Sequence, residues 1–434
     1  MKRRSFIGGL IILMLSVVFV VAACGGDEGT TTTAAPAETT SAVSTETTSA
    51  PSSETTSAPG SETTMTVAKE DVLKIGAISS VSGDLATAFK AMYDSVGPTQ
   101  EILNEEGGCT VGDTHYTIEL TMYDDQSTTA GGMTAISKLI GDGVKYVVPP
   151  MFMPINLAIA QTCEENKIMR VKSAGAGAAE TNPENPYMFF SFSSFTLMEP
   201  FYEYALAKYP EIKKVAVITP DDPGAVTFEE MTKAVYAERG IEIVYWEVYP
   251  QPSFDFYSIL NKALATNPDA IDMIFGIPPC TSAIINQSRE LGFEGPIFSP
   301  SVPGDANVIN AMLAPEWAYD ILASGPEVMS DKMIPRVQRL REMVLATGAS
   351  FEFDSLHLLD ACSAIVSAIE AAQSIETVDV VAAIDSGACE GFDGSYGPAT
   401  WGAYEEVYGN NHCAEPPAMV TAYNKGVLEF EWLK

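Results

Sequence analysis

Two kinds of segment alternate regularly between Val72 and Ser299. Short apolar runs bounded by turn residues are typical of buried strands, and the longer runs between them carry apolar residues at helical spacing. The expected strands are residues 72–78, 116–123, 145–148, 168–171, 214–218, 241–249, 271–276 and 297–299. The expected helices are residues 86–105, 127–140, 156–165, 197–209, 228–239, 257–265 and 281–291. This alternation predicts an α/β fold in which helices cover both faces of parallel sheets.

The length of the patterned region predicts two lobes. Residues 72–434 number about 363, which exceeds the size at which one hydrophobic core usually divides into two. In sheets of this kind, ligands bind at the loops that follow the carboxyl ends of the strands. Two such sheets facing each other would form a cleft, so we expect a binding function there.

The first 24 residues have the composition of an export signal. Lys2, Arg3 and Arg4 form a cationic head, the uncharged apolar run 7–21 follows, and Ala22-Ala23-Cys24 ends it with small residues. This run of about fifteen residues is shorter than the roughly twenty that a membrane-spanning helix needs. The pattern resembles a bacterial lipoprotein signal, which predicts lipidation of Cys24 and a protein anchored to the membrane at the cell surface or in the periplasm. The alternative is an ordinary signal peptide, or an uncleaved anchor, in which Cys24 is incidental.

Residues 25–70 form a predicted linker. Between Asp27 and Thr66 nearly every residue is Thr, Ser, Ala, Pro or Glu, and none is aromatic. A segment with so little apolar surface cannot offset the conformational entropy that it would lose on ordering. We therefore expect a disordered tether with a root-mean-square reach of roughly 30 to 40 Å.

The formal charge argues against two classes of partner. The chain has 57 acidic and 24 basic residues, which gives a formal net charge of −33. A surface of this sign repels nucleic acid and anionic lipid headgroups. Solubility explains the charge, and the alternative is that the charge steers cationic ligands to the protein.

Six cysteines besides Cys24 are compatible with disulfide bonds in an exported protein. They are Cys109, Cys163, Cys280, Cys362, Cys389 and Cys413. Cys389 with Cys413 is the preferred pair because both lie in a glycine-rich, loop-like region, and Cys109 with Cys163 is the second choice. Cys362 lies in an apolar helical run and is also compatible with a buried thiol.

The chain carries no sequence motif for catalysis. The motifs G-x-S-x-G, H-E-x-x-H and G-x-x-x-x-G-K-[ST] do not occur. The three histidines, His115, His357 and His412, are far apart in sequence, and no two cysteines have C-x-x-C spacing. We therefore expect a binding protein rather than an enzyme, with no metal and no other cofactor.

Several short segments, in their order and spacing, resemble one family of binding proteins. They are Ser80-Val81-Ser82-Gly83, Tyr123-Asp124-Asp125-Gln126-Ser127, Thr181-Asn182-Pro183, Asp221-Asp222-Pro223-Gly224, Ser288-Arg289-Glu290-Leu291-Gly292 and Leu359-Asp360-Ala361. These segments resemble the branched-chain amino-acid type of periplasmic binding protein, the solute receptors of ABC importers. The similarity covers essentially the whole patterned region.

This resemblance implies the type I periplasmic binding fold, in which two doubly wound parallel-sheet lobes are joined by a three-strand hinge. The implied crossings between lobes lie near residues 190–194, 322–326 and 396–401. Lobe 1 would comprise residues 71–192 and 324–398, and lobe 2 residues 193–323 and 399–434. The resemblance also implies a monomer whose lobes close over a small solute, and an ABC permease as the partner that recognises the closed form.

The resemblance indicates where lobe 1 would contact the solute. In amino-acid receptors of this family, hydroxyl side chains and backbone N–H groups after the third and fourth strands hold the ligand carboxylate. The corresponding stretches here, 149–154 and 172–177, keep only one hydroxyl. The lobe 1 candidates are Ser80, Ser82, Met151, Phe152, Met153, Ser173, Ala174 and Gly175. Small residues leave backbone N–H groups accessible to an anion, whereas the Met-Phe-Met cluster either forms an apolar wall or packs in the core.

The lobe 2 candidates depart further from the amino-acid receptors. In those receptors a carboxylate neutralises the ammonium group of the ligand, and tyrosines close over the ligand. In this chain, Ser301 occupies the place of the carboxylate, and Pro223 and Ile277 occupy the places of the tyrosines. Ser301 cannot neutralise an ammonium, and burying an unpaired cation costs on the order of several kcal/mol. Either Asp222 or Asp305 takes over this role, or the solute is an amide or a short or aromatic carboxylate. Asp222 is alternatively a solvated turn residue.

The sequence therefore predicts an extracytoplasmic receptor that delivers a small organic solute to an ABC importer. Two alternatives remain open. The first is a sensing receptor of the same fold that passes its signal to a membrane protein. The second is an anchored hydrolase with an unfamiliar active site.

Overall fold

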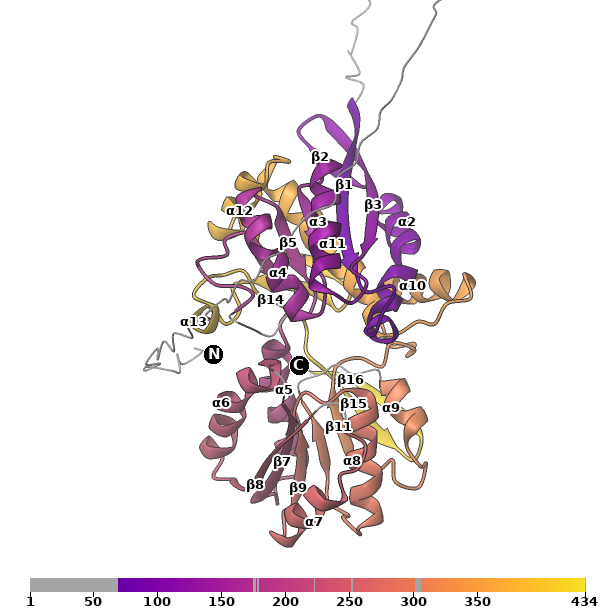
Figure 1. Cartoon of the computed structure of the whole chain (residues 1–434), viewed down its shortest axis with the longest axis vertical. Helices are drawn as coiled ribbons and strands as arrows, with labels where there is room; N and C mark the ends of the chain where they lie inside the picture. The colour runs from indigo at the N-terminus through magenta and orange to yellow at the C-terminus, as the bar shows by residue number, and fades with distance from the viewer. Residues whose placement is uncertain are drawn as a thin grey trace, which may run out of the picture. The chain divides into compact units, whose positions relative to one another are not determined.

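The computed structural model describes residues 69–433 apart from 175, 176, 178, 222, 251, 252 and 301–305. The predicted signal, including Cys24, and the predicted linker as far as residue 68 lie outside the described residues. The described part belongs to one compact unit, Ala68–Lys434. This unit contains two large sheets, each covered by helices (Figure 1).

The first sheet, around which we define lobe 1, has six strands in the order β2-β3-β1-β4-β5-β6. These are β1 (Lys69–Ser79), β2 (Cys109–Val111), β3 (Thr114–Asp124), β4 (Tyr146–Val148), β5 (Met169–Lys172) and β6 (Met188–Phe190). All neighbouring pairs are parallel except β2 with β3. β1 includes Lys69 and Glu70, the last two residues of the predicted linker.

Within residues 72–299, the helices of lobe 1 follow the predicted alternation of strands and helices with one exception. They are α1 (Ala86–Asp94), α2 (Val96–Glu105), α3 (Thr129–Gly141), α4 (Met153–Glu165), α10 (Pro335–Ala346), α11 (His357–Ala372) and α12 (Thr377–Asp385), with the 3-10 turn η1 (Phe353–Leu356) before α11. The single helix predicted over 86–105 is wrong, because the chain breaks at Ser95. Pro98 has no N–H to bond the carbonyl of Asp94, and its ring would clash with that carbonyl in a continuous helix. The Ser95 hydroxyl instead donates to the carbonyl of Met92 at 2.8 Å.

α11 forms the centre of the lobe 1 core. Among the described residues, the stretch 353–372 is one that is long and apolar enough to cross a membrane, but 72% of its apolar window is buried within the protein. Its residues Leu359, Cys362 and Ile365 join the hydrophobic cluster that also contains Ile75 of β1 and Val171 of β5. Burial of this kind is typical of a core helix.

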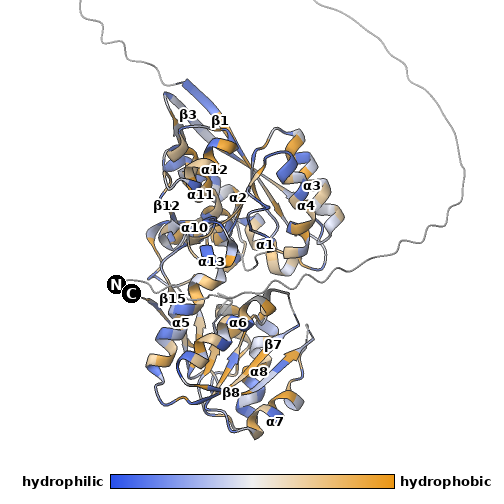
Figure 2. Cartoon of the chain, turned by 90° about the vertical axis from the view of Figure 1, so that its left-hand side faces the viewer, coloured by the Kyte–Doolittle hydropathy of each residue, from blue (hydrophilic) through white to orange (hydrophobic). Residues whose placement is uncertain are grey.

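The second sheet, around which we define lobe 2, has seven strands in the order β16-β15-β11-β10-β9-β7-β8. These are β7 (Lys214–Pro220), β8 (Glu242–Tyr249), β9 (Ala270–Met273), β10 (Ile297–Ser299), β11 (Ile321–Ser324), β15 (Met419–Asn424) and β16 (Val427–Trp432). β7 to β11 are parallel, and the C-terminal hairpin β15–β16 adds two antiparallel strands beside β11. β7 is buried along almost its whole length and is coloured as apolar in Figure 2.

The helices of lobe 2 are α5 (Ser194–Lys208), α6 (Pro223–Glu238), α7 (Tyr257–Ala265), α8 (Pro278–Glu290) and α9 (Ala306–Met312). α7 has the predicted bounds, and the others that were predicted begin three to five residues earlier than expected because the prediction started each helix at its apolar stripe. A small antiparallel sheet, β12 (Gly391–Gly394), β13 (Gly397–Trp401) and β14 (Ala414–Glu415), and the short helix α13 (Glu405–Tyr408) complete the described fold.

Candidate functional site

The chain passes between the lobes at the carboxyl ends of their parallel strands. β6 ends at Phe190, and the next residues lead into α5 of lobe 2, whose N-cap is Ser193. β11 ends at Ser324, and the chain then enters the lobe 1 core at Val328. Each sheet therefore turns its carboxyl ends toward the crossings. We call these two sides the lobe 1 edge and the lobe 2 edge.

The first loop of the lobe 1 edge is held by two carboxylates. The Ser80 hydroxyl donates to Asp125 Oδ1 at 2.6 Å, and the Ser82 hydroxyl donates to Asp124 Oδ2 at 2.5 Å. Burial would raise the pKa of Asp124, but hydrogen bonds from Ser82, Gln126 and Val81 lower it below the usual value. Both hydroxyls thus fix the loop, with Ser80 buried and Ser82 exposed. Their contact with a solute stays a prediction.

The Met-Phe-Met cluster begins helix α4 rather than filling the core. Phe152 is the N-cap of α4 and is 37% exposed, and Met151 and Met153 are half-buried. The core-packing alternative therefore does not fit Phe152. The cluster gives the lobe 1 edge an accessible apolar surface.

Ser173 and Ala174 follow β5 on the same edge. Ser173 is fully buried and donates to Asp360 Oδ2 at 3.3 Å. Ala174 has φ +62°, a left-handed conformation that is uncommon for residues other than glycine. Gly175, the last candidate of lobe 1, lies outside the described residues.

Asp360 of α11 joins three separate segments near the crossings. Its carboxylate accepts hydrogen bonds from the hydroxyls of Ser173 and Ser191 and, at 2.9 Å, from the backbone N–H of Ser395. Ser191 lies just beyond β6, and Ser395 lies between β12 and β13. Burial raises the pKa of Asp360 despite these hydrogen bonds. In the sequence, Asp360 stands out only as part of the Leu359-Asp360-Ala361 motif. An acidic residue inside an apolar helical run was the signal for its role.

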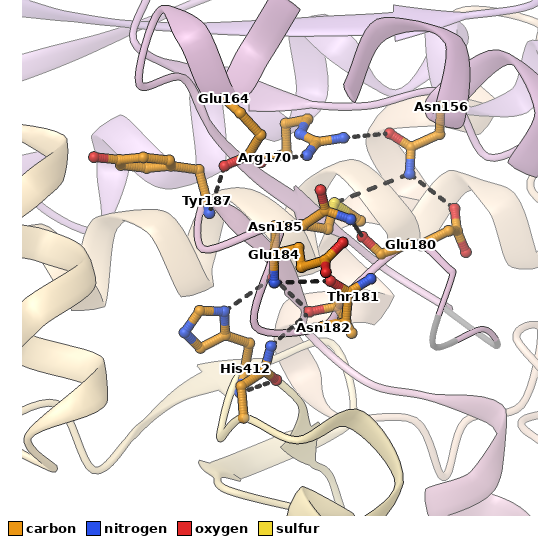
Figure 3. Close-up of polar contacts among 12 residues, drawn as sticks. Asn156, Glu164, Arg170, Glu180, Thr181, Asn182, Glu184, Asn185, Tyr187 and His412 are labelled. Atoms are coloured by element: carbon orange, nitrogen blue, oxygen red, sulfur yellow. Dashed lines mark hydrogen bonds and ion pairs between the residues drawn. The ribbon is translucent and has the colours of Figure 1, made fainter. Parts of the chain in front are cut away.

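A second polar network was not predicted and lies behind the lobe 1 edge. Arg170 Nη2 pairs with Glu164 Oε1 at 2.7 Å, and Arg170 Nη1 donates to Asn156 Oδ1 at 3.3 Å. Asn156 Nδ2 donates in turn to Glu180 Oε1 at 2.8 Å (Figure 3). Lys172 Nζ reaches the same oxygen at 2.6 Å, with both side chains buried. Two cations and two carboxylates balance, so the ends of β5 and the loop before β6 are held without net buried charge.

The lobe 2 edge presents fewer polar groups. Pro223 is the first residue of α6, and Ile277 is the N-cap of α8 with a side chain that is 40% exposed. Pro278 and Pro279 follow Ile277, and neither has an N–H to donate. Asp222, Ser301 and Asp305 lie outside the described residues, so their predicted roles stay predictions.

The expected Cys389–Cys413 disulfide is wrong, and so is the second choice, Cys109–Cys163. All six described cysteines are buried free thiols. Cys389 packs in a lobe 1 cluster and Cys413 in a lobe 2 cluster, while Cys109 and Cys163 also lie in separate clusters. In each of the two predicted pairs, the two sulfurs are therefore surrounded by the apolar side chains of different clusters. Among the described residues, no group of three or more His, Cys, Asp or Glu side chains is placed to hold a metal ion.

Two parallel-dominated sheets that turn their carboxyl ends toward shared crossings define a two-lobed α/β protein with the type I periplasmic binding fold. The chain belongs to the periplasmic binding protein family, whose model matches residues 72–426.

Known relatives agree with this assignment. The chain is 22% identical over 201 residues to the Leu/Ile/Val-binding protein homolog 3 of Brucella melitensis, a match that covers 46% of this chain and 53% of that protein. Among solved structures, the leucine binding protein LivK of Thermotoga maritima superposes with a TM-score of 0.64 at 22% identity, covering 83% of this chain and 98% of that one. A solute binding protein of an ABC transporter from R. palustris, in complex with benzoate, superposes with a TM-score of 0.64 at 16% identity over 84% of this chain and 96% of that one.

Proposed function

We propose that this protein is an extracytoplasmic solute-binding lipoprotein that captures a small organic solute between its lobes and delivers it to an ABC importer. The observation that carries the proposal is the position of two of the crossings, because the passages after β6 and after β11 both leave a sheet at its carboxyl end. A solute bound at one edge is therefore within reach of the other edge when the lobes close. Membership of the periplasmic binding protein family supports the same function.

The solute is a small organic molecule that is amino-acid-like, an amide, or a short or aromatic carboxylate. Two kinds of relative support this range, since one is named for leucine, isoleucine and valine and another was solved with benzoate. The accessible Phe152 and Ile277 side chains favour a solute with an apolar body.

Closure tests the proposal directly. The purified full chain is screened against amino acids, amides and aromatic or short carboxylates by thermal shift, and any solute that raises Tm is followed by small-angle scattering. A solute that stabilises the closed form raises the free energy of unfolding by about 3 kcal/mol at a hundredfold excess over Kd and lowers the radius of gyration. A chain whose Tm and scattering curve do not respond to any solute would contradict the proposal.

Delivery and anchoring have their own tests. Solute-loaded protein should stimulate ATP hydrolysis by a reconstituted ABC permease from the same genome, and activation of a kinase instead would indicate the sensing receptor.

The Cys24→Ala variant should appear in the culture medium while the parent chain remains with the membrane fraction. A parent chain without an acyl group on Cys24, measured by mass spectrometry, would remove the lipoprotein part of the proposal.

A further inference from the structure

The three predicted site serines that the structure describes on the lobe 1 edge all donate their hydroxyl hydrogens to carboxylates. The pairs are Ser80 with Asp125 at 2.6 Å, Ser82 with Asp124 at 2.5 Å, and Ser173 with Asp360 at 3.3 Å. A hydroxyl group has one hydrogen, so each serine oxygen keeps only lone pairs with which to bond a solute. These serines can therefore accept hydrogen bonds from a solute but cannot donate to a solute carboxylate.

Asp125 has a carboxylate oxygen that lacks a donor. In the described part of the chain, no group donates a hydrogen bond to Asp125 Oδ2, and this oxygen is buried. The other oxygen, Oδ1, accepts from the Ser80 hydroxyl and, at 2.8 Å, from the N–H of Ser127. A buried polar atom left without a partner costs on the order of 1 to 3 kcal/mol, and more when it is charged. Because Asp125 directly follows β3, a donor that binds at the lobe 1 edge would remove this cost.

The charge around Asp125 is negative. Asp124 is its neighbour in the chain, and no lysine or arginine of the described residues forms an ion pair with either carboxylate. Burial raises the pKa of Asp125, hydrogen bonds from Ser80 and Ser127 oppose this rise, and the charge of Asp124 adds to it. A cation beside Asp125 would relieve the repulsion between the two carboxylates.

The helices that begin at the two edges offer few donors to a solute carboxylate. In α4, the third and fourth N–H groups both donate to the carbonyl of Phe152, at 3.1 and 3.2 Å, and Pro154 has no N–H. In α8, the third and fourth N–H groups both donate to the carbonyl of Ile277, at 3.0 and 2.9 Å, and the first two residues are prolines. Free N–H groups at a helix start are what would bind an anion, so these two helix starts do not favour one.

We propose that the solute is a small organic amine with an apolar body, and that Asp125 determines this specificity by binding the protonated amino group through Oδ2. This inference rests on the proposed function and narrows the amino-acid-like part of its range, because the solute needs no carboxylate. The ammonium group supplies the donor that Oδ2 lacks, and the two carboxylates neutralise its charge, so the cation is not buried unpaired. The exposed side chains of Phe152 and Ile277 contact the apolar body.

Calorimetric titration of the full chain in detergent compares amines with carboxylates of the same body. The first three probes are L-leucine, isoamylamine, which is leucine without its carboxylate, and isocaproate, which is leucine without its amino group. The other two are benzylamine and benzoate, which share an aromatic ring. We expect each amine to bind at least about tenfold more tightly than the carboxylate of the same body, and L-leucine to bind no more tightly than isoamylamine.

A charge-neutral variant tests the residue itself. Asp125→Asn removes the charge and keeps the shape of the side chain, so the affinity for both amines should fall at least about tenfold while the affinity for isocaproate does not fall. Asp113→Asn is the matched control and should leave every affinity unchanged. Asp113 is exposed and precedes the opposite end of β3, about 35 Å from Asp125. Thermal unfolding without solute shows whether Asp125→Asn is folded, and if it is not, the five probes on the parent chain decide.

The outcomes separate the inference from the proposed function. The inference is overturned, while the proposed function stands, if either carboxylate binds as tightly as its matched amine or if L-leucine binds more tightly than isoamylamine. A folded Asp125→Asn variant with the parent affinity for amines also overturns it. If no organic solute of any class binds and the lobes never close, the proposed function fails and the inference fails with it.

Discussion

At the scale of single residues, the buried carboxyl group of Asp272 should make the stability of the protein depend on pH. Asp272 on β9 is fully buried, and the hydroxyls of Tyr202 and Tyr236 both donate to its Oδ2 at 2.7 Å. Burial raises the pKa of Asp272 to about 7 even though both hydroxyls lower it. The folded protein therefore retains a proton that the unfolded chain loses near pH 4. The stability contributed by this proton is fully present below pH 4 and is lost as pH rises to about 7.

The Asp272→Asn variant should remove this pH dependence. Between pH 5 and pH 8, the free energy of unfolding of the parent chain should fall by about 2 to 3 kcal/mol more than that of the variant. Urea unfolding at both pH values measures the difference. Glu238→Gln, an exposed change on α6, is the control and should behave like the parent. Equal pH dependence in Asp272→Asn and the parent chain would show that Asp272 is ionised in the folded state at pH 5.

Asp360 should contribute both to the stability of the protein and to its affinity for the solute. Asp360→Asn replaces one carboxylate oxygen by an amide that cannot accept the serine hydroxyls, so we expect a loss of about 2 kcal/mol in the free energy of unfolding. Because Ser173 and Ser191 lie at the lobe 1 edge and the first crossing, solute affinity should fall as well. Asp379→Asn, which breaks the exposed Ser374–Asp379 hydrogen bond of 2.7 Å, should change stability by less than about 0.5 kcal/mol. Equal effects of the two substitutions would contradict a special role for Asp360.

At the scale of elements, the strands and helices of residues 72–299 follow from local pattern. A buried strand such as β7 and an amphipathic helix such as α7 carry their periodicity in the sequence. The break at Ser95 and the early start of α4 at Met153 were missed because proline and cap geometry decide where an apolar stripe begins. The β15–β16 hairpin was not predicted, since its pairing with β11 depends on residues about one hundred positions away.

The start of α3 packs tightly against the loop that carries Asp125. A Cβ atom added at Gly131 would lie 1.8 Å from the carbonyl oxygen of Asp125, and one at Gly141 in the same helix would meet nothing within 4 Å. We expect Gly131→Ala to lower the free energy of unfolding by roughly 2 to 3 kcal/mol. Gly141→Ala should leave it unchanged or raise it by up to about 1 kcal/mol. Thermal or urea unfolding of the pair measures this, and similar values for the two variants would show that the loop yields to the added methyl group.

At the scale of the whole molecule, the six described cysteines are buried free thiols that form no disulfide with one another. Burial raises the pKa of Cys109 to about 12 and also raises the pKa values of Cys362, Cys389 and Cys413. We expect dithiothreitol to leave Tm unchanged, and a thiol reagent to react slowly with the native chain and with all six thiols in denaturant. A Tm that falls on reduction would show that a disulfide forms after all.

Some features of the candidate site follow from short sequence motifs, and others follow only from the tertiary structure. The loops of the lobe 1 edge were identified from motifs, because residues after a parallel strand must lie at its carboxyl end. The hydrogen-bond partners of Ser80, Ser82 and Ser173 were not identified from the sequence, since each hydroxyl donates to a carboxylate at least 42 positions away.

The sequence alone determined the family, the α/β class and the order of most elements in residues 72–299, because these depend on periodicity and turn chemistry within short windows. The tertiary structure decided which cysteines lie apart, which serine hydroxyls are already bonded, and which apolar side chains remain exposed at the two edges. These outcomes depend on which segments come into contact when two cores form, and burial and hydrogen bonding between distant residues are not encoded in any one segment.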